Sequence, residues 1–598
     1  MRMQRTHYRL AFGLLLVTLV LVSIGPQPTI AQERYNWFLA SDETYWYSLF
    51  NFANLVIRAG MGERLMPPPE MVQGMMQAAG VDKLPVQNPY LVMAPYASGD
   101  PHFIQQPDLS DAATLRWDPN KMDKTVTPEA IGYTIIKEVE WIKHFENFFE
   151  SGTFKGPPDS PNQNRFIAML LGNIAAATAR FAQENLRAEN GLFAAAWRDD
   201  QIADANIVGK DQVAMLWGLS SLASVTEGFD FYVAPLKREQ ALAMVDNTFK
   251  GIIAADMLQG MDNYYKGRVL QALAWYASTT EDESLRRRAV AELHAVALDL
   301  ASAIGPNGKV AGKPEDHSQL AVQASTVTGL LYAHALTDFA LYQDAAFEAW
   351  DYVQSLWDEQ AETFASDEGA NTYRYTAEEI GDIVGAFNTV IRVAGREELK
   401  SQFATFFRSA VKRSGLQLSE LLQSGGGQDG DGVPPPPMAG GQFGQAPVFA
   451  TAVAYNRGTG QWSVVDGQFT TAQAMYLADQ AIWTGEWKGH AFQGPPAHGI
   501  PTTTASIQEI SNEQIVRGLL LGLQRSQATQ LNALNDTLQE GLNKLQQSLN
   551  TLQQQQGRIS VQVDDLDSTT STNFTIALVA VILAGVLLLA LVFVLARR

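Results

Sequence analysis

Residues 318–337 read SQLAVQASTVTGLLYAHALT, and this segment carries the pattern that decides the fold. It opens on a hydroxyl residue suited to cap a helix, and its apolar residues recur at helical spacing. Similar segments begin at intervals of 49, 52, 55, 58 and 95 residues, near Asn162, Asp211, Asn263, Ser318, Thr376 and Thr471. An interval of roughly fifty residues fits two helices and a loop, so the pattern predicts stacked helical hairpins that bury their apolar faces against one another.

Six such hairpins can close into a ring, and we predict an all-α (α/α)6 toroid over residues 128–503. An open superhelix of the same hairpins is the alternative. The longest interval contains a Gly/Pro-rich tract, 424–447, which we expect to be a surface loop. The preceding region, 32–127, is expected to supply helices near 42–60 and 69–80 and then a loop that covers the ring.

The two ends of the chain are typical of a membrane-anchored exported protein. Residues 1–31 contain a basic stretch, an apolar run and a small-x-small site, which predict a cleaved secretory signal peptide; an uncleaved anchor is the alternative. Residues 574–596 carry no charge and are long enough to span a bilayer, and Arg597 and Arg598 then form a cytoplasmic tail. We therefore expect a single-pass cell-membrane protein whose body is extracellular.

A leucine-rich segment, 504–565, separates the predicted toroid from a short hinge at 566–573. Apolar residues recur there every seven positions, which predicts a coiled-coil stalk and a homo-oligomer. The alternative is a single helix packed against its own ring. The two core positions of the repeat hold Leu531, Leu538, Leu545, Leu552 and Ile559, and Asn535, Leu542, Leu549, Gln556 and Val563.

Composition excludes several classes of function. The chain has 43 basic and 63 acidic residues, a net charge of -20, which argues against binding nucleic acid. It has no cysteine, so thiol nucleophiles, disulfides and cysteine zinc sites are excluded. The sequence also lacks GxSxG, Walker and HExxH motifs. We expect neither a metal nor a cofactor.

Long polar loops precede the helix starts, at 190–210, 305–317, 358–375 and 458–470. Loops that enter equivalent helices of a ring lie on one face, so we predict the functional site there. Paired carboxylates can hydrolyse glycosidic bonds, and aromatic faces suit sugar rings. The candidate catalytic acids are Asp199, Asp200, Asp316 and Asp367, with Trp197, Tyr373 and Trp462 as stacking surfaces and Arg374 as an anion or hydroxyl contact.

Two further acids, Glu378 and Glu379, stand in the first turn of the helix that begins near Thr376. Carboxylates at a helix N-terminus stabilise the helix macrodipole, and this structural explanation is favoured over a catalytic one for both residues.

Six hairpins with long loops on one face resemble the (α/α)6 toroids of the six-hairpin glycosidase and polysaccharide lyase superfamily. The resemblance covers residues 128–485, is architectural and carries over no catalytic residue. It implies carbohydrate processing. The predicted function is therefore a membrane-anchored ectodomain that binds or processes a polysaccharide, as a glycoside hydrolase or lyase if it is an enzyme. The alternative is a non-catalytic envelope or scaffold protein whose toroid docks another protein.

Overall fold

The computed structural model describes residues 35–84, 87–108, 111–151, 161–226, 236–258, 260–419, 442–482, 486–487, 490–491 and 500–563. The chain divides into two compact units between Gly522 and Leu523. The predicted signal peptide and the predicted membrane span lie outside the described residues, so both stay predictions.

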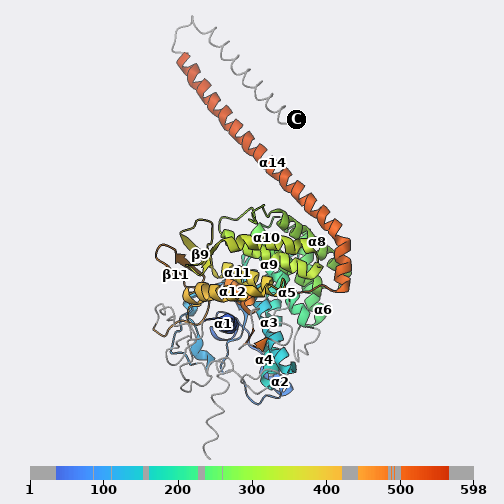
Figure 1. Cartoon of the computed structure of the whole chain (residues 1–598), viewed down its shortest axis with the longest axis vertical. Helices are drawn as coiled ribbons and strands as arrows, with labels where there is room; N and C mark the ends of the chain where they lie inside the picture. Colours follow the sequence, from blue (N-terminus) through green and yellow to red (C-terminus); the bar gives the residue numbers. More distant parts are fainter. Residues whose placement is uncertain are drawn as a thin grey trace, which may run out of the picture. The chain divides into compact units, whose positions relative to one another are not determined.

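An inner ring of helices forms the centre of the first unit (Figure 1). Each inner helix contacts the next, and the last contacts the first, so the ring is closed rather than open. Within the described residues its members are α3 (Pro128–Ser151), α5 (Gly209–Val225), α7 (Asn263–Thr279), α9 (Gln319–Thr337), α11 (Ala377–Arg392) and α13 (Thr471–Ile482).

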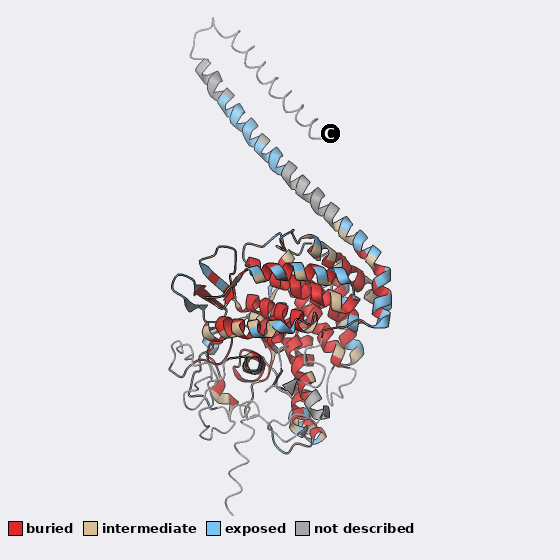
Figure 2. Cartoon of the chain, viewed as in Figure 1, coloured by how far each residue is buried: buried red, intermediate tan, exposed pale blue. Residues whose placement is uncertain are grey.

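An outer layer pairs with this ring, and Figure 2 shows that the helices of both layers are largely buried. The outer helices are α4 (Pro161–Asn185), α6 (Arg238–Ala254), α8 (Glu283–Ser302), α10 (Ala340–Ser355), α12 (Lys400–Phe407) and α1 (Trp37–Ala53). The predicted helical toroid is therefore confirmed.

Two assignments within the repeat were wrong. The helix near Asn162 is the outer helix α4, and the first inner helix is α3, which begins at Pro128. The first inner interval is thus 81 residues (128 to 209), not 49. The N-terminal helix α1, expected to belong to the cover, packs against α13 and completes the sixth hairpin. Helical periodicity does not distinguish inner from outer helices, because both bury apolar faces.

Short strands tie the loops together. A three-stranded antiparallel sheet joins β9 (Thr372–Thr376), β10 (Ala452–Asn456) and β11 (Gln461–Asp466), which confirms strand segments expected at 374–375 and 462–465. A second sheet joins β12, β3 and β4, and thereby connects the start of α13 to the N-terminal region. The remaining bounds are β1 (Gly62–Arg64), α2 (Pro69–Ala79), β2 (Val92–Pro95), β3 (Ser98–Gly99), β4 (Met122–Asp123), β5 (Ala196–Arg198), β6 (Gln201–Asp204), β7 (Trp357–Asp358), β8 (Thr363–Phe364), β12 (Phe469–Thr470), β13 (Glu486–Trp487), β14 (His490–Ala491) and α14 (Ala505–Val563).

The inner helices begin where their capping residues predict. The hydroxyl of Ser318 accepts from the backbone of Ala321 at 3.1 Å, and Thr376 forms a capping box with Glu379. These local signals place the N-termini of the inner helices, and those N-termini hold the polar residues described below.

One helix in the described part of the chain has the length and composition of a membrane span, Asn162–Asn185 within α4. Its most apolar stretch is 78% buried inside the protein, as expected for a core helix of a toroid.

Neighbouring inner helices approach closely at glycines. A Cβ on Gly267 of α7 would lie 2.2 Å from the carbonyl oxygen of Ser325 on α9. A Cβ on Gly132 of α3 would lie 2.4 Å from the carbonyl oxygen of Ala214 on α5. The backbones of these pairs are therefore close enough to require glycine.

We expect Gly267→Ala to lower the free energy of unfolding by about 1–3 kcal/mol, because the added methyl group overlaps a backbone oxygen that cannot rotate away. Chemical denaturation measures the change. Gly260→Ala is the control, since a Cβ there meets nothing within 4 Å. Equal stability of the two variants would contradict the close packing of α7 against α9.

Candidate functional site

Arg268, on the second turn of α7, lies among the N-terminal ends of the inner helices with a side chain that is 1% exposed. Its guanidinium donates to Glu378, to both carboxylate oxygens of Asp382 at 3.1 and 3.2 Å, and to the hydroxyl of Tyr264 at 2.6 Å. Glu378 and Asp382 are four residues apart on α11 and therefore share one face of that helix. A single cation thus holds two buried carboxylates.

Aromatic residues from other inner helices complete this arrangement. The ring of Tyr476 on α13 lies 4.0 Å from the Arg268 guanidinium, and its hydroxyl donates to Asp382 at 2.8 Å. The hydroxyl of Tyr133 on α3 lies 3.4 Å from the guanidinium. Arg268 therefore connects α3, α7, α11 and α13.

A set of buried and partly exposed side chains adjoins Arg268, and we call it the mouth cluster. Lys210 on α5 donates to Glu129 on α3 at 2.7 Å, and their side chains are 37% and 10% exposed. The ring of His317, from the loop before α9, lies edge-on to the half-buried ring of Tyr265. The mouth cluster consists of Glu129, Lys210, Tyr265, His317 and Glu378.

The two carboxyl groups of the mouth cluster have opposite pKa shifts. Burial raises the pKa of Glu129, and repulsion from Glu378 adds to this against the opposing charge of Lys210. Burial alone would raise the pKa of Glu378 as well, but the charges of Arg268 and Lys210 hold it below its usual value. Of the two acids, Glu129 therefore keeps its proton to higher pH than Glu378, although Glu129 is paired with Lys210.

Two further acids near the mouth cluster titrate close to neutrality. Burial, with repulsion from Glu129, raises the pKa of Asp211 on α5 to about 7. Burial raises the pKa of Asp382 to about 6, although Arg268 opposes the shift. Such clusters of perturbed carboxyl groups are characteristic of functional sites.

The four predicted catalytic acids lie elsewhere. Asp199 and Asp200 form the exposed turn between β5 and β6, with φ of 51° and 60°. Asp316 is 80% exposed, next to His317 of the mouth cluster. Asp367 accepts from the backbone of Gln319 at 3.0 Å and caps α9. Among the described contacts, none of the four bonds to Arg268 or Lys210, and their catalytic role stays a prediction.

The predicted carbohydrate contacts lie mainly on the β9–β10–β11 sheet. Tyr373 is buried and donates to Asp358 at 2.7 Å, while Arg374 is exposed on the same strand. Trp462 packs beside Tyr375 and Tyr455. Trp197 is in the core, edge-on against Phe181.

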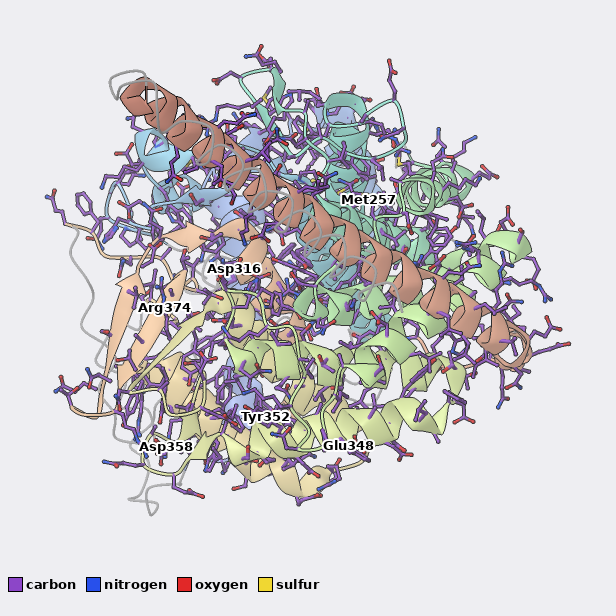
Figure 3. All side chains as sticks on the ribbon, turned by 90° about the horizontal axis from the view of Figure 1, so that it is seen from above. Met257, Asp316, Glu348, Tyr352, Asp358 and Arg374 are labelled. Carbon is purple, nitrogen blue, oxygen red and sulfur yellow. The ribbon has the colours of Figure 1, made fainter. Side chains whose placement is uncertain are left out.

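Tyr373 and Asp358 line a pocket of about 380 Å³ together with Trp357, Glu368 and Arg457. None of these residues belongs to the mouth cluster. Figure 3 shows Asp358 well apart from Asp316, which adjoins the mouth cluster. The predicted residues are therefore spread over the β5–β6 hairpin, the loops at the start of α9 and the β9–β10–β11 sheet rather than gathered in one site.

The prediction that the acids in the first turn of α11 stabilise the N-terminus of the helix is right for Glu379 and incomplete for Glu378. Glu379 accepts from the backbone of Thr376 and of Ser318, both at 2.9 Å, and so has a capping role. Glu378 faces Arg268 instead. The signal that could have found it is the acid pair at positions 378 and 382, together with a lone arginine inside the apolar helix α7.

The β5–β6 turn offers a direct test of Asp200. Positive φ at both central residues defines a type I′ turn, which favours Asn-Gly. We expect Asp200→Gly to raise the free energy of unfolding by about 0.5–1 kcal/mol and to leave any activity unchanged. Ile202→Gly, inside strand β6 and paired with Trp197, is the control and should destabilise, because glycine weakens a strand interior. Loss of activity in Asp200→Gly would instead support the role predicted from the sequence.

No protein-family model matches this chain, and no curated protein matches it. Solved structures with similar folds include a D-mannose isomerase (8% identity, TM-score 0.38, covering 69% of this chain and 95% of that one). A sugar epimerase from a ruminal bacterium has 10% identity and a TM-score of 0.40, covering 64% of this chain and 92% of its own. A Bacteroides ovatus GH9 structure has 10% identity and a TM-score of 0.35, and it covers 70% of this chain and 82% of that one.

These low similarities identify neither a family nor an activity. The chain's own helix contacts define the class: a closed helical toroid in which buried and half-buried ionisable groups meet at the N-terminal ends of the inner helices.

Proposed function

We propose that this protein binds and processes a carbohydrate at the mouth cluster, with Glu129 as proton donor and Glu378 as the ionised base or nucleophile. The opposite pKa shifts of these two carboxyl groups are the observation that carries the proposal. A pair of acids whose environments separate their pKa values can divide the roles of acid and base.

The chemistry follows from the atoms available. A protonated Glu129 can donate to the leaving oxygen of a glycosidic bond or to a ring oxygen, while the charged Glu378 takes a proton or stabilises positive charge. Tyr265 supplies a partly exposed ring beside both acids.

Surface location is the second part of the proposal, and it is supported by sequence alone. A cleaved signal at 1–31 and a span at 574–596 would place the toroid outside the cell, with Arg597 and Arg598 inside. Protease treatment of intact cells should then digest the toroid and leave a small membrane fragment. A fully protected toroid would exclude this topology.

The test of the carbohydrate function is a panel of polysaccharides and oligosaccharides, screened for binding and product formation with the purified full-length protein. We expect turnover of at least one member, and the activity should depend on Glu129. If no sugar binds or reacts, the carbohydrate function is wrong. The rival is a non-catalytic toroid that docks another protein, and the near-complete burial of the two acids favours it.

A further inference from the structure

Helix α14 runs unbroken from Ala505 to Val563 and carries leucines that are more than half exposed. In the second unit, Leu523, Leu542, Leu549 and Leu552 are 59%, 58%, 54% and 59% exposed. Figure 2 shows long stretches of α14 in the colour of exposed residues. Scattered exposed leucines need no explanation, but a row of them at helical spacing marks an interaction surface.

The spacing of this row is closer to an 11-residue repeat than to a heptad. From 516 to 549 successive positions of the row are separated by four, three and four residues, and this set of steps occurs three times. Nine of the ten positions are apolar. The repeat gives about 3.67 residues per turn, close to an undistorted helix, so the row runs almost straight along α14. The positions are Val516, Gln527, Leu538 and Leu549, then Leu520, Leu531 and Leu542, then Leu523, Leu534 and Leu545.

We propose that this leucine row is covered by the same row of a second copy of the chain, parallel and in register. A row that repeats along one helix is complementary to itself, and its straight course lets two helices pack over about 50 Å (about 34 residues at about 1.5 Å each). This row shares no residue with the mouth cluster, so the proposal does not depend on the carbohydrate function.

The charges on the helix agree with a second copy as the occupant. Between positions 516 and 556 the charged residues are Arg517, Arg525, Asp536, Glu540 and Lys544, so the two signs nearly balance, and Glu540 and Lys544 pair with each other at 2.6 Å within one helix. An oppositely charged partner therefore has little to recognise, whereas an identical helix needs no charge pattern. Parallel orientation follows from the proposed membrane span at 574–596, which would hold the C-terminal ends of both copies at one level.

The chain's lack of cysteine allows a direct test with single-cysteine variants of the full-length protein in dilute detergent. We expect Leu542→Cys and Leu549→Cys each to form disulfide-linked dimers on mild oxidation. Gln547→Cys is the control, because its position lies about 200° around the helix from Leu545. In an antiparallel dimer, Leu542 and Leu549 cannot both face the same residue of the second copy. A parallel register is therefore overturned if neither cysteine variant, or only one of them, forms a disulfide-linked dimer.

Charge substitution tests the same surface without a cross-link. Leu542→Glu with Leu549→Glu should shift the full-length protein from dimer to monomer by light scattering, while Gln547→Glu stays dimeric. The thermal unfolding of the toroid should be unchanged in both. A monomeric wild-type protein, or a dimer that persists in the double variant, overturns the proposal; a monomer is also the result if the row packs on lipid or on another segment of its own chain.

Discussion

Replacing Arg268 by methionine should lower the free energy of unfolding by about 3–5 kcal/mol, because it leaves two buried carboxyl groups without their cation. The side chain of Arg268 is 1% exposed, and those of Glu378 and Asp382 are 9% and 0% exposed. Water therefore cannot replace the lost partner. Urea denaturation followed by circular dichroism measures the change.

The pH dependence of this variant separates a lost ion pair from lost packing. In the native protein the pKa of Glu378 is lower than in the unfolded chain, so this group stabilises the fold at pH values above its unfolded-state pKa. The stability is lost as the pH falls through the folded-state pKa. In Arg268→Met the pKa of both acids should lie above the unfolded values. Their stabilising contribution is then present at low pH and is lost as pH rises through the folded-state values. The variant should thus be more destabilised at pH 8 than at pH 5, by about 1.4 kcal/mol for each unit of pKa increase.

Two comparisons control this prediction. Combining Arg268→Met with Glu378→Gln and Asp382→Asn should recover much of the stability, because neutral amides need no cation. Arg396→Met removes an exposed ion pair with Glu398 and should leave stability almost unchanged. Equal destabilisation of Arg268→Met at both pH values would show that the arginine acts by packing alone.

The largest expected effect on activity is that of Glu378→Gln and Glu129→Gln. Each should reduce kcat by about 10²- to 10⁴-fold against the sugar found in the screen, because each removes one half of the proposed acid–base pair. The amides keep the shape of the side chains, so circular dichroism should show a folded toroid. Steady-state kinetics with both variants measures the loss.

The pH profile assigns the two roles. Activity should fall at high pH as Glu129, whose pKa is raised, loses its proton, and at low pH as Glu378, whose pKa is lowered, gains one. The high-pH limb should therefore be altered in Glu129→Gln. The matched control is Asp316→Asn, since this acid adjoins His317 but is 80% exposed. Normal activity in Glu378→Gln with loss in Asp316→Asn would reverse the assignment of the site.

Local sequence patterns determined the helices and the face that holds the candidate site. Helix starts at Ser318 and Thr376 follow from hydroxyl capping, and the repeat of hairpins follows from apolar spacing. Because long polar loops precede four of the inner helices, at 190–210, 305–317, 358–375 and 458–470, the polar N-terminal ends of these helices could be assigned to one face. Helix capping and helical periodicity depend on residues that are close in sequence, so they can be recognised in a single sequence.

Only the tertiary structure decided which helices line the ring and which acids matter. Helix α1 pairs with α13 as the outer helix of the sixth hairpin although the two lie at opposite ends of the toroid sequence, and apolar periodicity contains no information on that pairing. Arg268 meets Glu378, 110 residues away, and this contact turns a first-turn acid into a buried, charged member of the mouth cluster. Burial and charge coupling depend on contacts between distant segments, so the pKa shifts that single out Glu129 and Glu378 arise only in the folded toroid.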